Sequence, residues 1–252
     1  IKILEFLASN IWSTAYNLSL LIDVNHLEYT RRLMERMIED GLIVKREFSC
    51  LSGKRIIYLL TDFGFLEIGY AVKPKFNFKT SHQNFIHSEL VQQLQIIAMN
   101  KNLEWRSEKS LIKSKEYKSY PDGLLISNHQ KISIELQRNR YSLEALKNKI
   151  AKCLADCLSA KFNKVLFVCA DNLNAEVMQK ALHSVTILKG KNHQDIHFSD
   201  QYKTYFEFIN FDEFQNYLQN TFEALVIFIK ACVNAPLGST HTKQKMSCLP
   251  LL

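Results

Sequence analysis

The segment from Lys164 to Ala170 places the strongest constraint on the fold, because it is an almost uninterrupted apolar run. A run of this kind is typical of a strand that is buried on both faces, as strands in parallel sheets are. Helical patterns flank it, from Ser142 to about Ser159 and from Asn174 to Val185, and another strand is expected at Tyr205–Ile209. The second half of the chain is therefore predicted to alternate helices with buried strands.

The region before this run supplies the other predicted elements of the same domain. A long helix begins at Ser81 or Asn84 and runs to about Met99, and a final helix covers Asp212–Cys232. Between the long helix and the buried run there are three strand-like segments, at Glu104–Leu111, Tyr120–Ile126 and Lys131–Gln137. A turn joins the last two segments as a hairpin, so the sequence predicts an α+β or α/β domain with a mixed central sheet.

The composition is that of a globular chain: 47% of its 252 residues are hydrophobic and 23% are charged. No segment approaches the roughly 18 uncharged apolar residues that a membrane span needs, so we expect no membrane span. The six cysteines include no CxxC pair, which favours reduced thiols and a cytoplasmic location. Residues 234–252 lack periodicity, and we expect them to be a disordered tail.

The first seventy residues predict three helices followed by a hairpin. The helices are Lys2–Ala8, a second that Ser13 or Thr14 caps, and a third from Asn25 to the stop at Gly41. Two alternating strands and a short helix follow, at Leu42–Phe48, Arg55–Leu60 and from Thr61 to Tyr70. This order is that of a winged helix-turn-helix, so we divide the chain into a DNA-binding domain (1–72), a linker (73–82) and a second domain (83–233).

In winged helix-turn-helix modules the third helix enters the major groove and the hairpin contacts phosphates. The sequence therefore predicts a DNA-binding surface on the third helix and the hairpin, formed by Tyr29, Thr30, Arg31, Arg32, Arg36, Lys45, Arg46, Lys54 and Arg55. The planar guanidinium of arginine suits guanine edges or phosphate. An alternative is a protein-interaction module, which the net neutrality of residues 1–73 favours slightly.

The net charge of +7 is concentrated in one stretch of the chain. Residues 101–164 carry 14 basic and 7 acidic residues, whereas the remainder of the chain is balanced. Such a stretch suits a polyanionic partner such as double-stranded DNA, although it could also be an ordinary lysine-rich surface.

Two carboxylates lie within this basic stretch, on the two strands of the predicted hairpin. Asp122 stands in the triplet Pro121-Asp122-Gly123, and Glu135 stands in Glu135-Leu136-Gln137. Carboxylates on adjacent strands can converge on one Mg²⁺ or Mn²⁺ ion, which prefers oxygen ligands. The order helix, three strands, helix, strand together with these residues resembles the PD-(D/E)XK nuclease core. The resemblance implies a metal that polarises the scissile phosphate and activates water.

The third position of that motif departs from the pattern, because Gln137 stands where a lysine is usual. Some members of the superfamily carry the lysine on the following helix, where Lys149 is the best candidate. The superfamily also implies a further acidic metal ligand, for which Glu89 and Glu108 are candidates. The alternative interpretation is that Asp122 makes a turn and that Glu135 pairs with a nearby arginine, either Arg138 or Arg140.

A winged helix joined to a PD-(D/E)XK-like domain resembles the replication-relaxation family and the MobC-type plasmid mobilisation relaxases. The resemblance rests on Arg31-Arg32 and Leu60-Thr61 in the first domain, and on the Asp122, Glu135 and Lys149 positions in the second. It implies a metal-dependent nickase that acts at a plasmid origin, with a second mobilisation or coupling protein as a partner. Two alternatives stay open: a non-catalytic origin-binding replication factor or repressor, and a restriction-type endonuclease.

Overall fold

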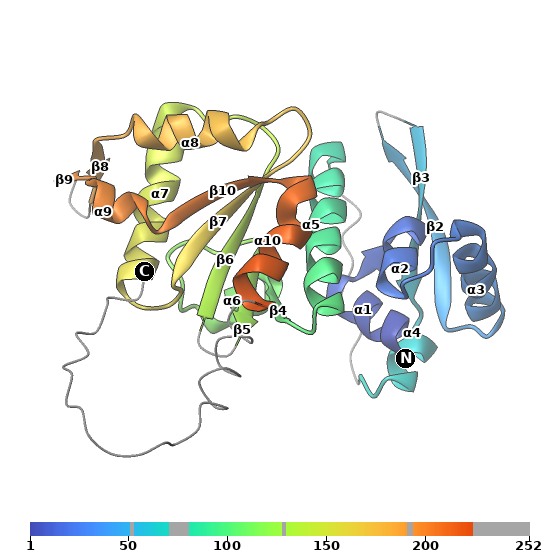
Figure 1. Ribbon diagram of the computed structural model, residues 1–252. Helices are drawn as coiled ribbons and strands as arrows, with labels where there is room; N and C mark the ends of the chain where they lie inside the picture. The colour runs from blue at the N-terminus through green and yellow to red at the C-terminus, as the bar shows by residue number, and fades with distance from the viewer. Residues whose placement is uncertain (51–52, 71–80, 128–129, 191–193, 224–252) are drawn as a thin grey trace, which may run out of the picture.

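The computed structural model describes residues 1–50, 53–70, 81–127, 130–190 and 194–223 (Figure 1). The fold is mixed α+β, and a mixed five-stranded sheet with the strand order β10-β7-β6-β5-β4 lies at its centre. Strand β7 is parallel to both of its neighbours, whereas β4, β5 and β6 are antiparallel to one another. Among the described helices, none combines the length and apolar character needed to cross a membrane.

The N-terminal unit has three helices, a three-stranded sheet of order β1-β3-β2 and a short closing helix. Its elements are α1 (Lys2–Asn10), β1 (Trp12–Ser13), α2 (Ala15–Leu21), α3 (Leu27–Glu39), β2 (Ile43–Cys50), β3 (Gly53–Leu60) and α4 (Asp62–Glu67). The predicted caps are present at Thr14 and Thr61, whose hydroxyls accept hydrogen bonds from backbone amides of the first turn. Helix α3 begins later than the predicted Asn25, because His26 occupies the N-cap. Gly41 ends it with φ at 71°, as predicted.

The second unit contains the central sheet and the helices on its two faces. Its elements are α5 (His82–Asn100), β4 (Glu104–Ser107), α6 (Glu108–Ser114), β5 (Gly123–Ser127), β6 (Gln130–Gln137), α7 (Leu143–Leu158), β7 (Lys164–Cys169), α8 (Ala175–His183), β8 (Ile187–Lys189), β9 (Asp195–His197), α9 (Asp200–Lys203), β10 (Phe206–Asn210), a 3₁₀ turn (Phe211–Glu213), α10 (Phe214–Leu218) and a π turn (Gln219–Glu223). The predicted buried strand is β7, whose last five residues are all buried. The sequence did not predict the small hairpin β8–β9, nor β1 and α9.

Two predicted strands are shorter than expected, and one of them is β5, which begins at Gly123 rather than Tyr120. The strand expected at Glu104–Leu111 ends at Ser107, and α6 follows directly from Glu108. The segment Glu108–Ser114 has helix-forming Glu, Lys and Leu and places only Leu111 in the core, which suits a short surface helix. The helix expected at Asp212–Cys232 passes through 3₁₀, α and π geometry up to residue 223. Its remainder and the predicted tail 234–252 lie outside the described residues.

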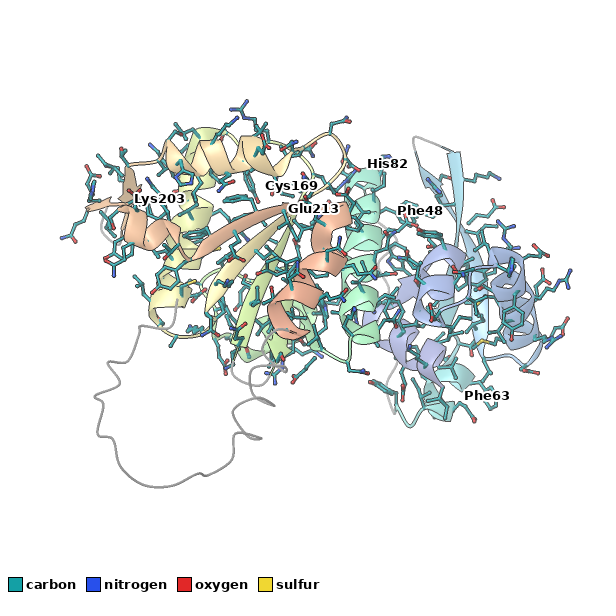
Figure 2. The ribbon with its side chains drawn as sticks, viewed as in Figure 1. Phe48, Phe63, His82, Cys169, Lys203 and Glu213 are labelled. Carbon is teal, nitrogen blue, oxygen red and sulfur yellow. The ribbon has the colours of Figure 1, made fainter. Side chains whose placement is uncertain are left out.

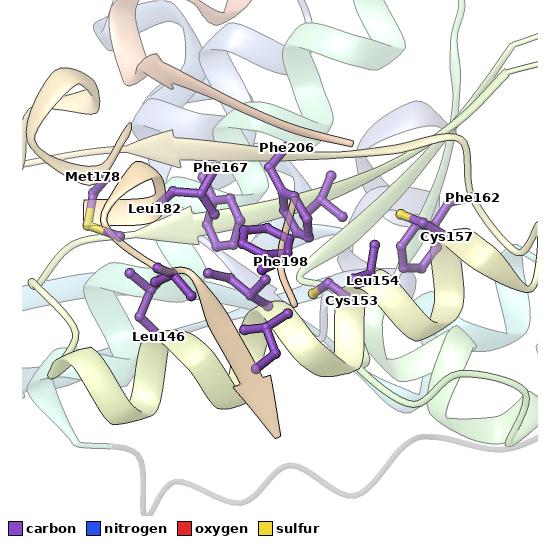
Figure 3. Packing of buried hydrophobic residues seen from close by; sticks show 14 of the residues in the cluster. Leu146, Cys153, Leu154, Cys157, Phe162, Phe167, Met178, Leu182, Phe198 and Phe206 are labelled. Atoms are coloured by element: carbon purple, nitrogen blue, oxygen red, sulfur yellow. The ribbon is translucent and has the colours of Figure 1, made fainter. Parts of the chain in front are cut away.

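Each face of the sheet packs against a layer of helices. On one face, Phe167 of β7 packs with Leu146 and Ile150 of α7 and with Leu182 of α8 (Figure 3). The other face of the same strands packs against α5 and α10, with Leu94 and Phe214 among the buried side chains. Three cysteines within the described residues are buried free thiols, Cys153, Cys157 and Cys169.

Helix α5 belongs to both units. Its Leu94 and Ala98 lie in the core under the central sheet, whereas its Ile96 lies in the core of the N-terminal unit. The predicted linker 73–82 overlaps the start of this helix, since Ser81 is its N-cap and His82 its first residue; residues 71–80 lie outside the described residues. The chain therefore has two cores that share one helix rather than two separate bodies.

Candidate active site and nucleic-acid interface

The strand pairing brings Asp122 and Glu135 side by side. Strand β5 begins at Gly123, which pairs with Ile134 of β6, so the residue before Gly123 stands next to Glu135. A β-carbon at Gly123 would lie 1.9 Å from Cζ2 of the Trp105 indole. Only glycine fits beneath this ring, which explains why a glycine follows Asp122 at the start of the strand.

Both oxygens of the Asp122 carboxylate have partners. Oδ2 accepts a hydrogen bond of 2.7 Å from the backbone amide of Leu136, which fixes the carboxylate against β6. Oδ1 lies 2.9 Å from Nε2 of His87, which α5 brings to the edge of the sheet. Burial lowers the pKa of His87, but the hydrogen bond and charge of Asp122 outweigh burial and raise this pKa above its ordinary value.

Glu135 is the most deeply buried acid of the site, and its partner is Lys149. The Lys149 Nζ lies 2.7 Å from Oε1 of Glu135, and the two side chains are 21% and 6% exposed. Helix α7 presents Lys149 toward the sheet because Leu146 and Ile150, which flank it, are packed inward. Lys149 was predicted to lie beside the two carboxylates, and in the structure it contacts one of them, Glu135.

Burial and the partner's charge have opposite effects on the pKa values of Glu135 and Lys149. Burial raises the pKa of Glu135, Lys149 lowers it and the neighbouring Asp122 carboxylate raises it, and together they place this pKa at about 8. Burial lowers the pKa of Lys149, but the Glu135 carboxylate outweighs burial and raises it. Holding two carboxylates in a desolvated place is unfavourable unless cations neutralise them. Lys149 and His87 are the basic side chains that contact these carboxylates.

These groups line one cavity of about 360 Å³. Three acids reach it, namely Asp122, Glu135 and Glu108, and the pKa of Glu108 is raised because the cavity wall desolvates it and Asp122 repels its charge. Glu89 is not among the lining residues: its backbone carbonyl accepts a hydrogen bond from Asn17 of α2, on the side of α5 that faces the N-terminal unit. The structure thus does not bring the predicted Glu89 into this cavity, and His87 is the side chain that α5 places next to Asp122.

Gln137 lines the cavity, but its amide is already engaged. The side chain is buried, and its Nε2 donates to the backbone carbonyl of Asn139. Arg138 pairs with Asp171 at 2.6 Å, so the alternative in which Glu135 pairs with Arg138 is wrong. Gln137, which stands where the motif usually has a lysine, thus hydrogen-bonds to the loop after β6. The positive charge near Glu135 comes instead from Lys149 of α7.

Sequence reasoning missed His87, Arg138 and Tyr141 as cavity residues. No sequence signal joins His87 to Asp122, because the contact depends on how α5 packs on the sheet. Tyr141 has a weaker signal, since it directly precedes the helix that carries Lys149. Burial raises the pKa of Tyr141 to about 12, so this phenol stays protonated at neutral pH.

The predicted DNA-binding residues on α3 lie at the surface with one exception. Tyr29 is 57% exposed, and the side chains of Arg31 and Arg32 are 56% and 71% exposed. Arg36 is also exposed. Thr30 is fully buried, so it cannot contact a ligand at this surface, and its assignment to the DNA-binding surface is wrong. The helical period turns Thr30 toward the core of the unit, whereas its neighbours face outward.

The basic residues of the β2–β3 hairpin are exposed as well, namely Lys45, Arg46, Lys54 and Arg55. Lys54 pairs with Glu47 across the hairpin at 2.9 Å. Arg31 and Arg32 similarly lie 3.8 and 3.6 Å from Glu28. Exposed pairs of this kind contribute little, so a phosphate can compete for these cations at small cost.

Comparison with protein-family models, with curated proteins and with solved structures found no match. No group of three or more His, Cys, Asp or Glu side chains within the described residues could hold a metal ion. The donor set nevertheless suits Mg²⁺, which often binds through one or two carboxylates and keeps waters or substrate oxygens as its other ligands. Asp122 and Glu135 are the two carboxylates that would fill this role.

Proposed function

We propose that the chain is a DNA-binding, metal-dependent endonuclease that nicks duplex DNA. The observation that carries the proposal is the meeting of Asp122, Glu135 and Lys149 in one cavity, although they come from a strand start, a strand and a helix. The resemblance to the MobC-type relaxases and the replication-relaxation family makes a plasmid origin the substrate class. In this proposal the N-terminal unit acts as a winged helix-turn-helix that recognises the DNA. The unit with the central sheet acts as a PD-(D/E)XK-like domain that cleaves it.

The site residues have distinct roles in this proposal. Asp122 and Glu135 would hold Mg²⁺ or Mn²⁺, which polarises a phosphodiester and lowers the pKa of bound water. Lys149 pairs with Glu135, opposes the rise in its pKa that burial causes, and would offer an ammonium to the negative charge that develops on the phosphate. His87 and the Leu136 amide fix the orientation of Asp122, because each contacts one of its two carboxylate oxygens.

Incubation of the full chain with supercoiled plasmid DNA and Mg²⁺ or Mn²⁺ tests the proposal. We expect conversion to the nicked circle and no conversion when EDTA is added. Linear product would favour the restriction-type alternative. Unchanged DNA together with duplex binding would favour the non-catalytic binding protein, which the engaged amide of Gln137 independently supports.

Arginines on α3 are expected to dominate the affinity for DNA. Arg32→Ala should cost about 1–3 kcal/mol of binding free energy if the guanidinium reads a base, and less if it meets a phosphate. Fluorescence anisotropy at low salt, with duplexes selected for binding, measures the effect for Arg31, Arg32 and Arg36 in turn. Lys180→Ala on the exposed face of α8 is the control. Unchanged affinity in all three arginine variants would exclude this face of α3 from the interface.

The basic stretch, residues 101–164, predicts that the affinity for DNA falls as the salt concentration rises. Lys113, Lys115 and Lys118 are exposed at the C-terminal end of α6 and in the loop after it, whereas Glu108 is the first residue of this helix. If each meets a phosphate, the triple change to Gln should reduce the slope of log K against log salt by about 2.7. Replacing Lys180 and Lys189, which lie on α8 and β8, should leave the slope unchanged. An unaltered slope in the triple variant would mean that these lysines are an ordinary charged surface.

A further inference from the structure

An aromatic stack fixes the β2–β3 hairpin to the helix that carries His87. The ring of Phe85 in α5 lies 4.5 Å from Trp12 and 4.6 Å from Phe48, and both pairs are nearly parallel. Phe85 is 2% exposed. Figure 2 shows Phe48 beside the end of α5 where His82 lies. Stacked pairs of this kind contribute beyond the area they bury, so the hairpin is held against α5 rather than projecting freely.

A buried polar network continues the contact along the helix. Gln92, 3% exposed, donates to the carbonyl of Trp12 and accepts from the Ser13 hydroxyl, with both distances at 2.8 Å. Asn17 donates to the side chain of Gln92 and to the carbonyl of Glu89. Near the end of the helix, Asn100 donates to the carbonyl of Leu20. Buried hydrogen bonds between the two units favour one arrangement of these units.

The cavity lies at the same end of α5 as the stack. Gln83, Asn84 and His87 line it, and Phe85 lies between them in sequence. A smaller groove joins the two units at this place, with Asn10 and Trp12 on one side and Lys109 on the other. Asp122 and His87 line both the groove and the cavity. The hairpin and Asp122 are therefore both contacted by the same end of one helix, through Phe85 and His87.

We infer that α5 makes the DNA-reading unit and the cutting site one rigid body. Cleavage then falls at a single fixed offset from the sequence that α3 contacts, on the side where the hairpin lies. This inference rests on the proposed function, and it adds the class of substrate: a duplex with the recognised sequence and the scissile phosphate at a constant spacing. Two units joined only by a tether would instead cut at several spacings.

The offset can be measured without relying on the chain's own chemistry. Asn139→Cys places a thiol at the cavity rim of the full chain, in a background where Cys50, Cys232 and Cys248 are serine. The remaining thiols are buried with raised pKa values and react poorly. An iron–EDTA chelate on the new thiol cuts nearby DNA through hydroxyl radicals. With duplexes selected for binding, we expect one cluster of cuts, on one side of the protected sequence and at the same spacing in every duplex.

The outcomes separate the inference from the proposed function. Binding with cuts on both sides, or at spacings that differ between duplexes, overturns the inference alone. Failure to bind any duplex overturns the proposed DNA binding and the inference with it. One cluster from the chelate, with no cleavage by the unlabelled chain in Mg²⁺, supports the rigid body and contradicts the nuclease.

Variants of the stack give a second readout. Phe48→Ala and Gln92→Ala should replace the single cluster by cuts spread over more phosphates, whereas Phe48→Tyr should retain it, because a tyrosine ring stacks in the same way. A merely structural role would lower the amount of bound protein without moving the cuts. A single unmoved cluster in both alanine variants would overturn the role of α5, and if either variant fails to fold, the parent chain still gives the decisive measurement.

Discussion

Asp122→Ala is expected to abolish the conversion of supercoiled DNA to nicked circle while leaving duplex affinity unchanged. The substitution removes one of the two carboxylates proposed for the metal, and α3 with its arginines lies in the other unit. Loss of a partner that only orients a metal ligand commonly costs 10–100-fold, so loss of the ligand itself should exceed about 100-fold. Nicking rates at saturating Mg²⁺ and binding isotherms on the same preparation measure both quantities.

A conservative variant separates chemistry from folding. Asp122→Asn can still accept from the Leu136 amide and face His87, so it should keep the fold and lose the nicking, because a neutral amide is a poor ligand for a hard cation. Glu135→Gln should behave in the same way. The control is Asp195→Asn on β9, whose carboxylate is exposed and pairs with Lys189. Equal nicking by the parent and by Asp122→Ala would assign the activity to a contaminant and leave a DNA-binding protein.

Much of the fold could be predicted because local patterns decide it. The apolar run that became β7, the threonine caps of α2 and α4 and the glycine after α3 are properties of a few neighbouring residues. Thr30 shows the limit of treating a whole helical segment as a surface. Its neighbours in sequence are exposed, but the helical period turns this one residue into the core.

Site residues that strand pairing brings together could be predicted from the sequence, whereas those that depend on how a helix packs against the sheet could not. Asp122 and Glu135 meet because their strands are adjacent, which a hairpin prediction already implies. The choice between Glu89 and His87 depends on the rotation of α5, and both residues lie within one turn of that helix. Only the assembled structure shows that His87 lines the cavity and contacts Asp122, whereas Glu89 does not line the cavity.

Lys149→Met is expected to be the most destabilising change in the site. It removes the cation from a carboxylate that is 6% exposed, and breaking a buried ion pair from one side typically costs about 3–5 kcal/mol of unfolding free energy. Urea unfolding at neutral pH without divalent ions measures the loss. Lys189→Met is the matched control, because the Lys189–Asp195 pair is about half exposed on both sides, at 55% and 58%, and should contribute under about 1 kcal/mol. A loss as small as that of the control would mean that Glu135 and Lys149 are not buried together.

The double variant Glu135→Met with Lys149→Met tests whether folding requires the two buried charges. Replacing both partners of a buried pair by apolar side chains of similar volume is often neutral or stabilising, so we expect it to recover most of the stability that Lys149→Met loses. Recovery would show that the fold does not need the two charges, and that they are held in the cavity for a ligand. No recovery would instead make the pair a structural element, and the case for a metal at Glu135 would fail with it.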